Sequence, residues 1–393
     1  MRLPAGVLPT CWRWLELSSS IPFWMYIIGF PLLLGPLVTL HELGHYLVGR
    51  WFGVHAEVFS VGFGKELAGF TDRRGTRWKL SALPLGGYVR FKGDMNPASM
   101  PIRADRPAKA DRDGSFEHAP VGQRALIVAA GPVTNILVTM AIFAGFFMAI
   151  GKPVPLSPER QLTIAGFADV SPARDAGMRV GDRIVAIDGK PMADFRALQD
   201  AVLLHPGKRM TIAYERGGEQ QAVPVTATST EETDRFGNVS RIGLIGVRPA
   251  AVAYSWERQD PFTAVALSAR SCVDIMRMMV MGLGQIVSGE RSVKELGGPV
   301  KIAKYSGEQL SMGPLAFINF VALISLNLAF INLLPIPGLD GGHLAFYAAE
   351  AIRRKPVGAR GLEVAYRTGM ALVLMLMLFV TINDLASLPI FGR

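Results

Sequence analysis

Four long stretches without a charged side chain constrain the fold of this 393-residue chain more than any other feature. They are residues 17–40, 125–150, 309–339 and 368–383. A membrane-spanning helix needs about 20 consecutive apolar residues. The first three runs meet this length, and the fourth, of 16 residues, can be extended on both sides. We therefore expect a polytopic α-helical membrane protein with four spans, near 17–51, 125–150, 313–334 and 368–383.

The first run leads without a loop into the sequence HELGH, residues 41–45. His41 and His45 are four residues apart, so they share one face of a helix and can both bind one zinc ion. Glu42 lies beside them, where it can act as general base on an attacking water. The alternative is two structural histidines with satisfied hydrogen bonds. Because ionisable side chains at membrane depth are expensive, the functional interpretation is favoured.

A catalytic zinc site uses three protein ligands, and the third run offers one where it ends. Asp340 follows the run within the sequence NLLPIPGLDGG, residues 332–342. Its prolines and glycines break a helix, and irregular backbone at membrane depth is tolerated where it lines a cavity. The alternatives are an ordinary helix end, or His343 as the third ligand in place of Asp340.

The two motifs together resemble the site-2 protease family of intramembrane zinc metalloproteases, and within it the bacterial RseP-like group. Further matches are GGYV at 86–89, GPVTN at 131–135 and a PDZ-like segment between the second and third spans. Proteins of the RseP type carry two tandem PDZ domains, whereas this sequence shows one. The resemblance implies a zinc endopeptidase with one Zn²⁺ per chain, held by His41, His45 and Asp340. It also implies cleavage of the transmembrane segments of single-span proteins, such as trimmed anti-sigma factors or signal-peptide remnants, in regulated intramembrane proteolysis.

Residues 57–93 alternate apolar and polar side chains and predict a β-hairpin, which the resemblance implies is associated with the membrane. Its second arm holds Leu85, Gly86 and Gly87, which we expect at a strand edge that binds an extended substrate by β-augmentation. A plain hairpin packed on the helices is the alternative. The resemblance implies that Asn332 also positions the substrate, whereas Asn135 is expected to make interhelical hydrogen bonds.

The remaining segments are assigned from composition. Residues 94–120 are rich in Pro, Asp, Arg and Ala and predict a flexible cytoplasmic linker that ends the first domain, 1–150. Residues 162–250 resemble one circularly permuted PDZ domain that binds or filters substrates; a generic α/β domain is the alternative. Residues 261–312 predict an amphipathic helical connector, favoured over a fifth span because charges interrupt it. The last two spans, with the LDG motif, occupy 313–393.

Basic residues indicate the orientation. Residues 50–124 contain 13 Lys or Arg, and the connection between the third and fourth spans adds Arg353, Arg354, Lys355 and Arg360, so both loops are expected in the cytoplasm. The PDZ-like domain and both termini would then lie in the periplasm of a bacterium, with the chain in the inner membrane. The net charge of +9 is explained by basic loops at an anionic lipid bilayer, and no nucleic-acid-binding motif accompanies it.

The rival function is a catalytically silent, membrane-anchored PDZ scaffold or chaperone that binds protein ends. Glu42 argues against it, because a scaffold has no use for a general base.

Overall fold

The computed structural model describes residues 21–93, 114–155, 160, 162–203, 205–233, 239–250, 254–289, 293, 297–355 and 358–386. Their contacts divide the chain into two units. The first contains residues 1–144, 265–279 and 297–393, and the second contains residues 145–264 and 280–296. The predicted domain boundaries are not tested by this division and stay a prediction.

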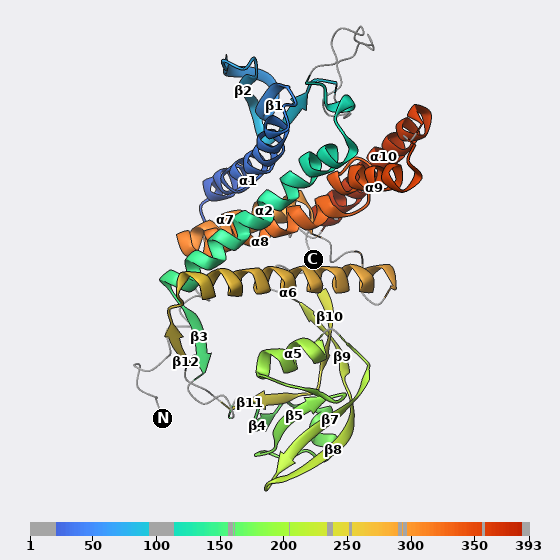
Figure 1. The fold of residues 1–393 in the computed structure, drawn as a ribbon. Helices are drawn as coiled ribbons and strands as arrows, with labels where there is room; N and C mark the ends of the chain where they lie inside the picture. Colours follow the sequence, from blue (N-terminus) through green and yellow to red (C-terminus); the bar gives the residue numbers. More distant parts are fainter. Residues whose placement is uncertain are drawn as a thin grey trace. The chain divides into compact units, whose positions relative to one another are not determined.

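Four helices in the described part of the chain are long and apolar enough to cross a membrane. They are α1 (Phe23–Trp51), α2 (Val121–Ala149), α8 (Pro314–Leu333) and α10 (Ala359–Ala386), labelled in Figure 1. Each overlaps one of the four uncharged runs, so the predicted helices are confirmed, while the number of membrane crossings stays a prediction. On α10 the large side chains of Leu374 and Met375 are 57% and 68% exposed. Such an apolar outer face is what a helix surrounded by lipid requires.

The connection into α8 contains a second helix, α7 (Pro299–Ser311). Its N-terminus is capped by a carboxylate from α10, because Asp384 accepts hydrogen bonds from the backbone N–H groups of Gly298 and Lys301 at 3.1 and 3.0 Å. The Lys301 ammonium lies 3.8 Å from the same, fully buried carboxylate. This charge pair balances a group that would otherwise be costly to bury.

The hairpin consists of β1 (Ala56–Thr71) and β2 (Arg77–Phe91), and both strands are bent. Residues 58–61 of β1 have pairing partners on both sides, 87–90 on one and 77–80 on the other. Gly62 has φ +90°, and a side chain there would collide with the Leu83 carbonyl oxygen at 2.6 Å, so glycine permits the bend. The final segment of β2 thereby becomes an edge strand, with β1 as its strand partner among the described residues.

The predicted linker is ordered where it meets α2. Residues 94–113 lie outside the described residues, but 114–120 contain the short 3-10 helix η3 (Phe116–His118). The Phe116 ring is buried and stacks on Phe91 with 5.8 Å between centroids. One aromatic residue in a polar segment thus attaches the linker to the hairpin, and the expectation of flexibility is corrected for these seven residues.

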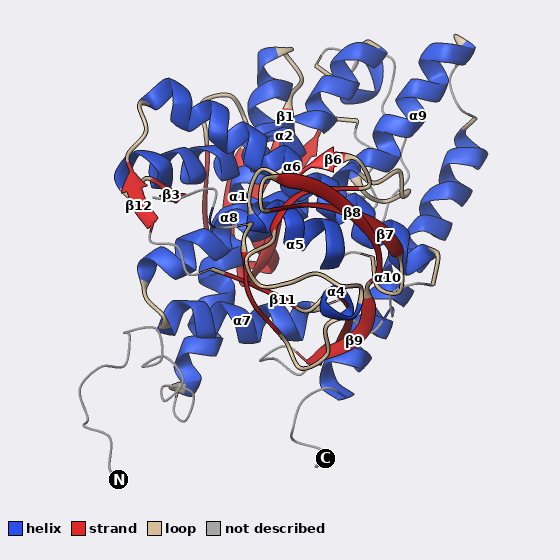
Figure 2. Cartoon of the chain, turned by 90° about the horizontal axis from the view of Figure 1, so that it is seen from below, coloured by secondary structure: helices blue, strands red, loops and turns tan. Residues whose placement is uncertain are grey.

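The second unit is built on a four-stranded antiparallel sheet of order β6-β5-β7-β8. Figure 2 shows β7 and β8 as neighbouring curved strands. In chain order its elements are β4 (Ile164–Phe167), α4 (Pro172–Asp175), β5 (Arg183–Ile187), β6 (Lys190–Pro191), α5 (Phe195–Leu203), β7 (Arg209–Arg216), β8 (Glu219–Thr226), β9 (Thr228–Thr233), β10 (Val239–Leu244) and β11 (Val247–Pro249). Buried Ile184, Leu198 and Ile212 join the sheet to α5 in one apolar core. Helix α5 therefore packs on the sheet through its buried side chains.

Two strands flank this sheet domain and bring its ends together. β3 (Lys152–Pro155) pairs antiparallel with β12 (Tyr254–Glu257). The chain then enters α6 (Pro261–Val287), which begins here because the Asp260 carboxylate accepts hydrogen bonds from two first-turn N–H groups at 3.0 and 3.1 Å.

Candidate metal centre

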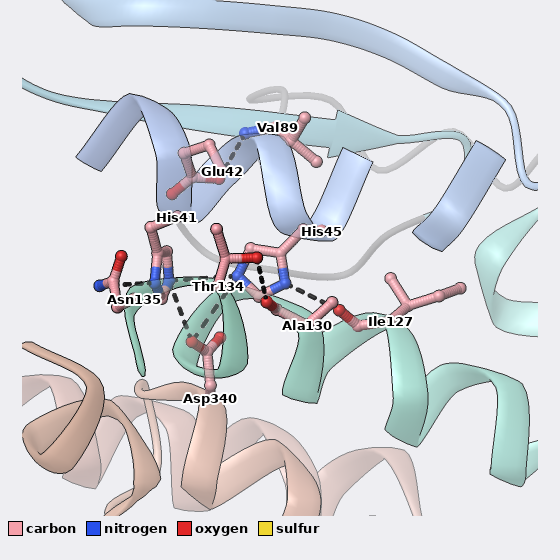
Figure 3. A network of polar contacts seen from close by, with 9 residues as sticks. All are labelled: His41, Glu42, His45, Val89, Ile127, Ala130, Thr134, Asn135 and Asp340. Carbon is pink, nitrogen blue, oxygen red and sulfur yellow. Dashed lines mark hydrogen bonds and ion pairs between the residues drawn. The ribbon is translucent and has the colours of Figure 1, made fainter. Parts of the chain in front are cut away.

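His41 and His45 lie one turn apart on α1, and their rings point toward the same spot (Figure 3). Their Nε2 atoms are 3.2 Å apart. Oδ2 of Asp340 lies 3.2 Å from Nε2 of His41 and 3.6 Å from Nε2 of His45. The three donor atoms all lie within 4.8 Å of one another, and both histidines are buried. The structure therefore brings the three predicted ligands together.

The chemistry of these atoms fits a bound cation. Nδ1 of His45 lies 2.8 Å from the backbone oxygen of Ile127, so it carries the ring proton and leaves a lone pair on Nε2. Oδ2 of Asp340 is buried and has no hydrogen-bond partner among the described residues. In the histidine tautomers that leave both Nε2 atoms unprotonated, the lone pairs of these donors converge in a buried place and repel one another unless a positive ion lies between them. Two imidazole nitrogens and one carboxylate oxygen are a donor set that zinc prefers.

The interruption of helical structure after α8 determines the position of Asp340. The chain leaves the helix after Leu333, and Asp340 is the first residue of α9 (Asp340–Arg353). A Cβ on Gly341 would lie 2.3 Å from the Leu334 carbonyl oxygen, and one on Gly342 would lie 2.3 Å from that of Ile336. The glycines that follow the aspartate are thus required for the tight turn that directs it to the histidines.

A glycine on α2 makes room for the imidazole rings. A Cβ on Gly131 would lie 2.3 Å from Nε2 of His45 and 2.7 Å from Cε1 of His41. On the facing side, a Cβ on Gly44 would lie 2.6 Å from the Ala130 carbonyl oxygen. The two helices therefore approach closely at this depth because both contact positions lack a side chain.

Glu42 faces the edge strand of the hairpin. Its Oε2 accepts a hydrogen bond from the backbone N–H of Val89 at 3.0 Å (Figure 3). The sequence motif alone places this carboxylate beside the histidines, but the strand that holds it comes from a segment nearly fifty residues away. The bond fixes the carboxylate at the boundary between α1 and β2.

A cavity of about 240 Å³ connects these groups. Its wall includes the three candidate ligands, Glu42, Gly87 and Asn332. Leu85 and Gly86, also predicted to contact substrate, belong to β2, and their contact with substrate stays a prediction. Gly86 has φ +152°, which marks the bend just before the edge strand.

Two polar residues at the cavity have partners that the sequence did not indicate. Asn135, expected to make interhelical bonds, lies with its Nδ2 3.3 Å from Nδ1 of His41. His343, the rival ligand, lines the cavity but is outside the described group of converging metal donors. Its Nδ1 lies within hydrogen-bond distance, 2.6 Å, of the Tyr366 hydroxyl oxygen. The GPVTN motif was the one available signal for Asn135.

Comparisons with known proteins agree with this site. The profile described as Peptidase family M50 matches residues 29–376. A protein of Agrobacterium fabrum, named as a candidate zinc metalloprotease, is 42% identical over 367 residues, which cover 92% of this chain and 96% of that protein. Metalloprotease MmpA of Caulobacter vibrioides is 32% identical over 395 residues, covering 94% and 98% of the two chains.

Among solved structures, the PDZ domain of an SdrC-like protein from Listeria monocytogenes matches 23% of this chain and 88% of its own length, with 22% identity and a TM-score of 0.19. The family match extends over most of the chain and overlaps all four long apolar helices. The chain is therefore a multi-pass membrane protein that belongs to peptidase family M50, the site-2 protease family.

Proposed function

We propose that this protein is a zinc endopeptidase that hydrolyses peptide bonds within the transmembrane segments of single-span membrane proteins. The observation that carries the proposal is the convergence of His41, His45 and Asp340 at one cavity that Glu42 also lines. The names of the relatives as metalloproteases support the same chemistry.

One Zn²⁺ per chain would be held by His41, His45 and Asp340. When bound, the ion would act as a Lewis acid on the scissile carbonyl and make a water molecule more acidic. The residues of the chain supply the rest. Glu42 takes a proton from the attacking water and then delivers it to the leaving nitrogen, while the Val89 N–H holds the Glu42 carboxylate in place.

The edge strand of β2 is the proposed substrate-binding element. A helical segment must become extended before hydrolysis, and an unpaired strand edge can bind an extended peptide through main-chain hydrogen bonds. Gly87 lines the cavity, and Leu85 and Gly86 precede it in the same strand. Asn332, at the end of α8, supplies an amide that can bind a substrate carbonyl.

The proposed topology has four spans in a bacterial inner membrane, with both termini and the sheet domain in the periplasm. In this arrangement α1 and α8 run in the same direction. His41 lies toward the C-terminal end of α1 and Asp340 follows the C-terminal end of α8, which is consistent with the contact between the two residues. The lipid bilayer and single-span substrates, such as trimmed anti-sigma factors or signal-peptide remnants, are the expected partners.

The sheet domain, 162–250, is proposed as a PDZ-like module that restricts access and takes no part in the chemistry. Replacing it with a short flexible linker should leave zinc binding and cleavage of a pre-trimmed substrate intact. The variant should also begin to cut an untrimmed substrate that the intact protein spares. Unchanged discrimination between the two substrates would remove the module from selectivity.

The test of the function is metal analysis together with cleavage of a model single-span substrate by the purified protein and its Glu42→Gln variant. Because glutamine keeps the shape but not the basicity, zinc should remain bound while turnover falls by about 10²–10⁴-fold. The matched control is Glu117→Gln at an exposed position, which should keep wild-type turnover. Comparable cleavage by Glu42→Gln would refute the role of Glu42 as general base, and an absence of cleavage by the wild type would favour the silent scaffold or chaperone.

A further inference from the structure

Asn135 is a fully buried amide in the middle of α2, and the proposed function gives this residue no role. Its Nδ2 lies 3.3 Å from Nδ1 of His41, the ring nitrogen on the opposite side from the metal position (Figure 3). Its Oδ1 is buried and has no hydrogen-bond partner among the described residues. A buried amide with half of its bonding capacity unused requires an explanation.

The hydrogen bonding of a neutral imidazole explains the unused oxygen of the Asn135 amide. With Nδ2 donating to Nδ1, the single ring proton of His41 is on Nε2, which lies 3.2 Å from Asp340 Oδ2. Binding a metal through Nε2 requires the opposite tautomer, in which the proton is on Nδ1 and needs an acceptor. A half-turn of the Asn135 amide brings Oδ1 to Nδ1 and provides that acceptor. An asparagine can serve both tautomers because its amide carries a donor and an acceptor.

We propose that Asn135 is a positioning residue for the metal site, which accepts the Nδ1 proton of His41 and so fixes the tautomer that binds zinc through Nε2. The inference rests on the proposed zinc site and adds the residue that completes its hydrogen bonding. His45 already has an equivalent partner, the Ile127 carbonyl oxygen at 2.8 Å. With Asn135 in this role, each histidine is oriented by a bond from α2 to its outer nitrogen.

The backbone around Asn135 is held in place by two hydroxyl groups. The Asn135 carbonyl oxygen accepts hydrogen bonds from Thr139 Oγ1 at 3.0 Å and from Ser325 Oγ of α8 at 2.9 Å. Ser325 therefore fastens the same residue without being bonded to the imidazole. Substitution of Ser325 therefore changes only the packing of Asn135, whereas substitution of Asn135 itself changes the bond to His41.

The experiment measures the zinc dissociation constant of the full-length purified protein by competition with a chelator, and its thermal stability after metal removal. Asn135→Leu has a similar size but no acceptor, and zinc binding should weaken by about 10–100-fold. Asn135→Asp restores an acceptor and should bind zinc at least as tightly as the wild type. Ser325→Ala should lower stability and leave the zinc dissociation constant unchanged.

Two results would overturn the inference. One is a wild-type zinc dissociation constant in folded Asn135→Leu; the other is a loss of affinity that Asn135→Asp does not reverse. If the leucine variant does not fold, Asn135→Ala is subjected to the same comparison. His41→Ala separates the inference from the proposed function, because retention of zinc by that variant would refute the site itself.

Discussion

A single methyl group on Gly131 should disable the metal site without touching any candidate ligand. In Gly131→Ala the new Cβ would lie 2.3 Å from Nε2 of His45 and 2.7 Å from Cε1 of His41, where ordinary contacts are 3.4 Å or more. At least one ring must therefore move by about 1 Å, several times the roughly 0.2 Å tolerance of metal-ligand distances.

The magnitude follows from the cost of overpacking. Inserting a methyl group into a close-packed site costs about 1–3 kcal/mol. If the rings yield, this strain appears as zinc binding that is about 5- to 150-fold weaker. The helix itself should not suffer, because alanine forms helices better than glycine by about 1 kcal/mol.

The assay is chelator competition on the purified protein, with Gly145→Ala as the matched control. Gly145 is on the same helix, and a Cβ there meets nothing within 4 Å. The control should retain the wild-type zinc dissociation constant and turnover. Gly131→Ala that binds zinc as tightly as the control and cleaves at the same rate would refute the close approach on which the site depends.

The remaining predictions concern the third ligand, the topology and the sheet domain. Asp340→Ala should lose zinc at limiting metal as well as activity, since it removes one of three donors; full occupancy would contradict its role. Cysteines introduced at Ser99 and Gly218 should react with impermeant reagents from the cytoplasmic and periplasmic side respectively, and reaction of both from one side would exclude the four-span topology. Burial raises the pKa of Asp182, but hydrogen bonds from the Arg216 guanidinium and a backbone N–H outweigh it and lower this pKa below its ordinary 3.8. The stabilising contribution of the Asp182 carboxylate is therefore fully present above pH 3.8 and is lost as pH falls through the lowered pKa. Thermal unfolding of the sheet domain should accordingly depend less on pH in Asp182→Asn than in the wild type. Identical pH dependence of unfolding in the two proteins would argue against the ion pair.

Local patterns in the sequence were sufficient for the helices and for half of the site. An uncharged run such as 125–150 has few structures open to it in hydrocarbon, because every backbone polar group must be satisfied within the segment. The spacing of His41 and His45 is a property of one helical turn, and the start of α6 is decided by Asp260 and the proline after it. Each of these depends on residues within a few positions of one another.

The third ligand was predictable for a different reason. Asp340 follows a long uncharged run whose last residues include two prolines and a glycine that break a helix, so its presence at membrane depth required an explanation within the sequence itself. That the aspartate reaches the histidines could be expected from the direction of the spans, but its distances of 3.2 and 3.6 Å to their Nε2 atoms come only from packing.

Tertiary structure alone decided which groups surround those ligands. The bend in the hairpin delivers the Val89 N–H to Glu42, and Asn135 faces His41 because Gly131 and Gly44 allow α1 and α2 to approach closely. An amide on an apolar helix could have bonded to any neighbour, so composition and periodicity leave its partner open. These contacts join segments far apart in the chain, and their identity depends on how helix faces pack, a property that no local stretch of sequence encodes.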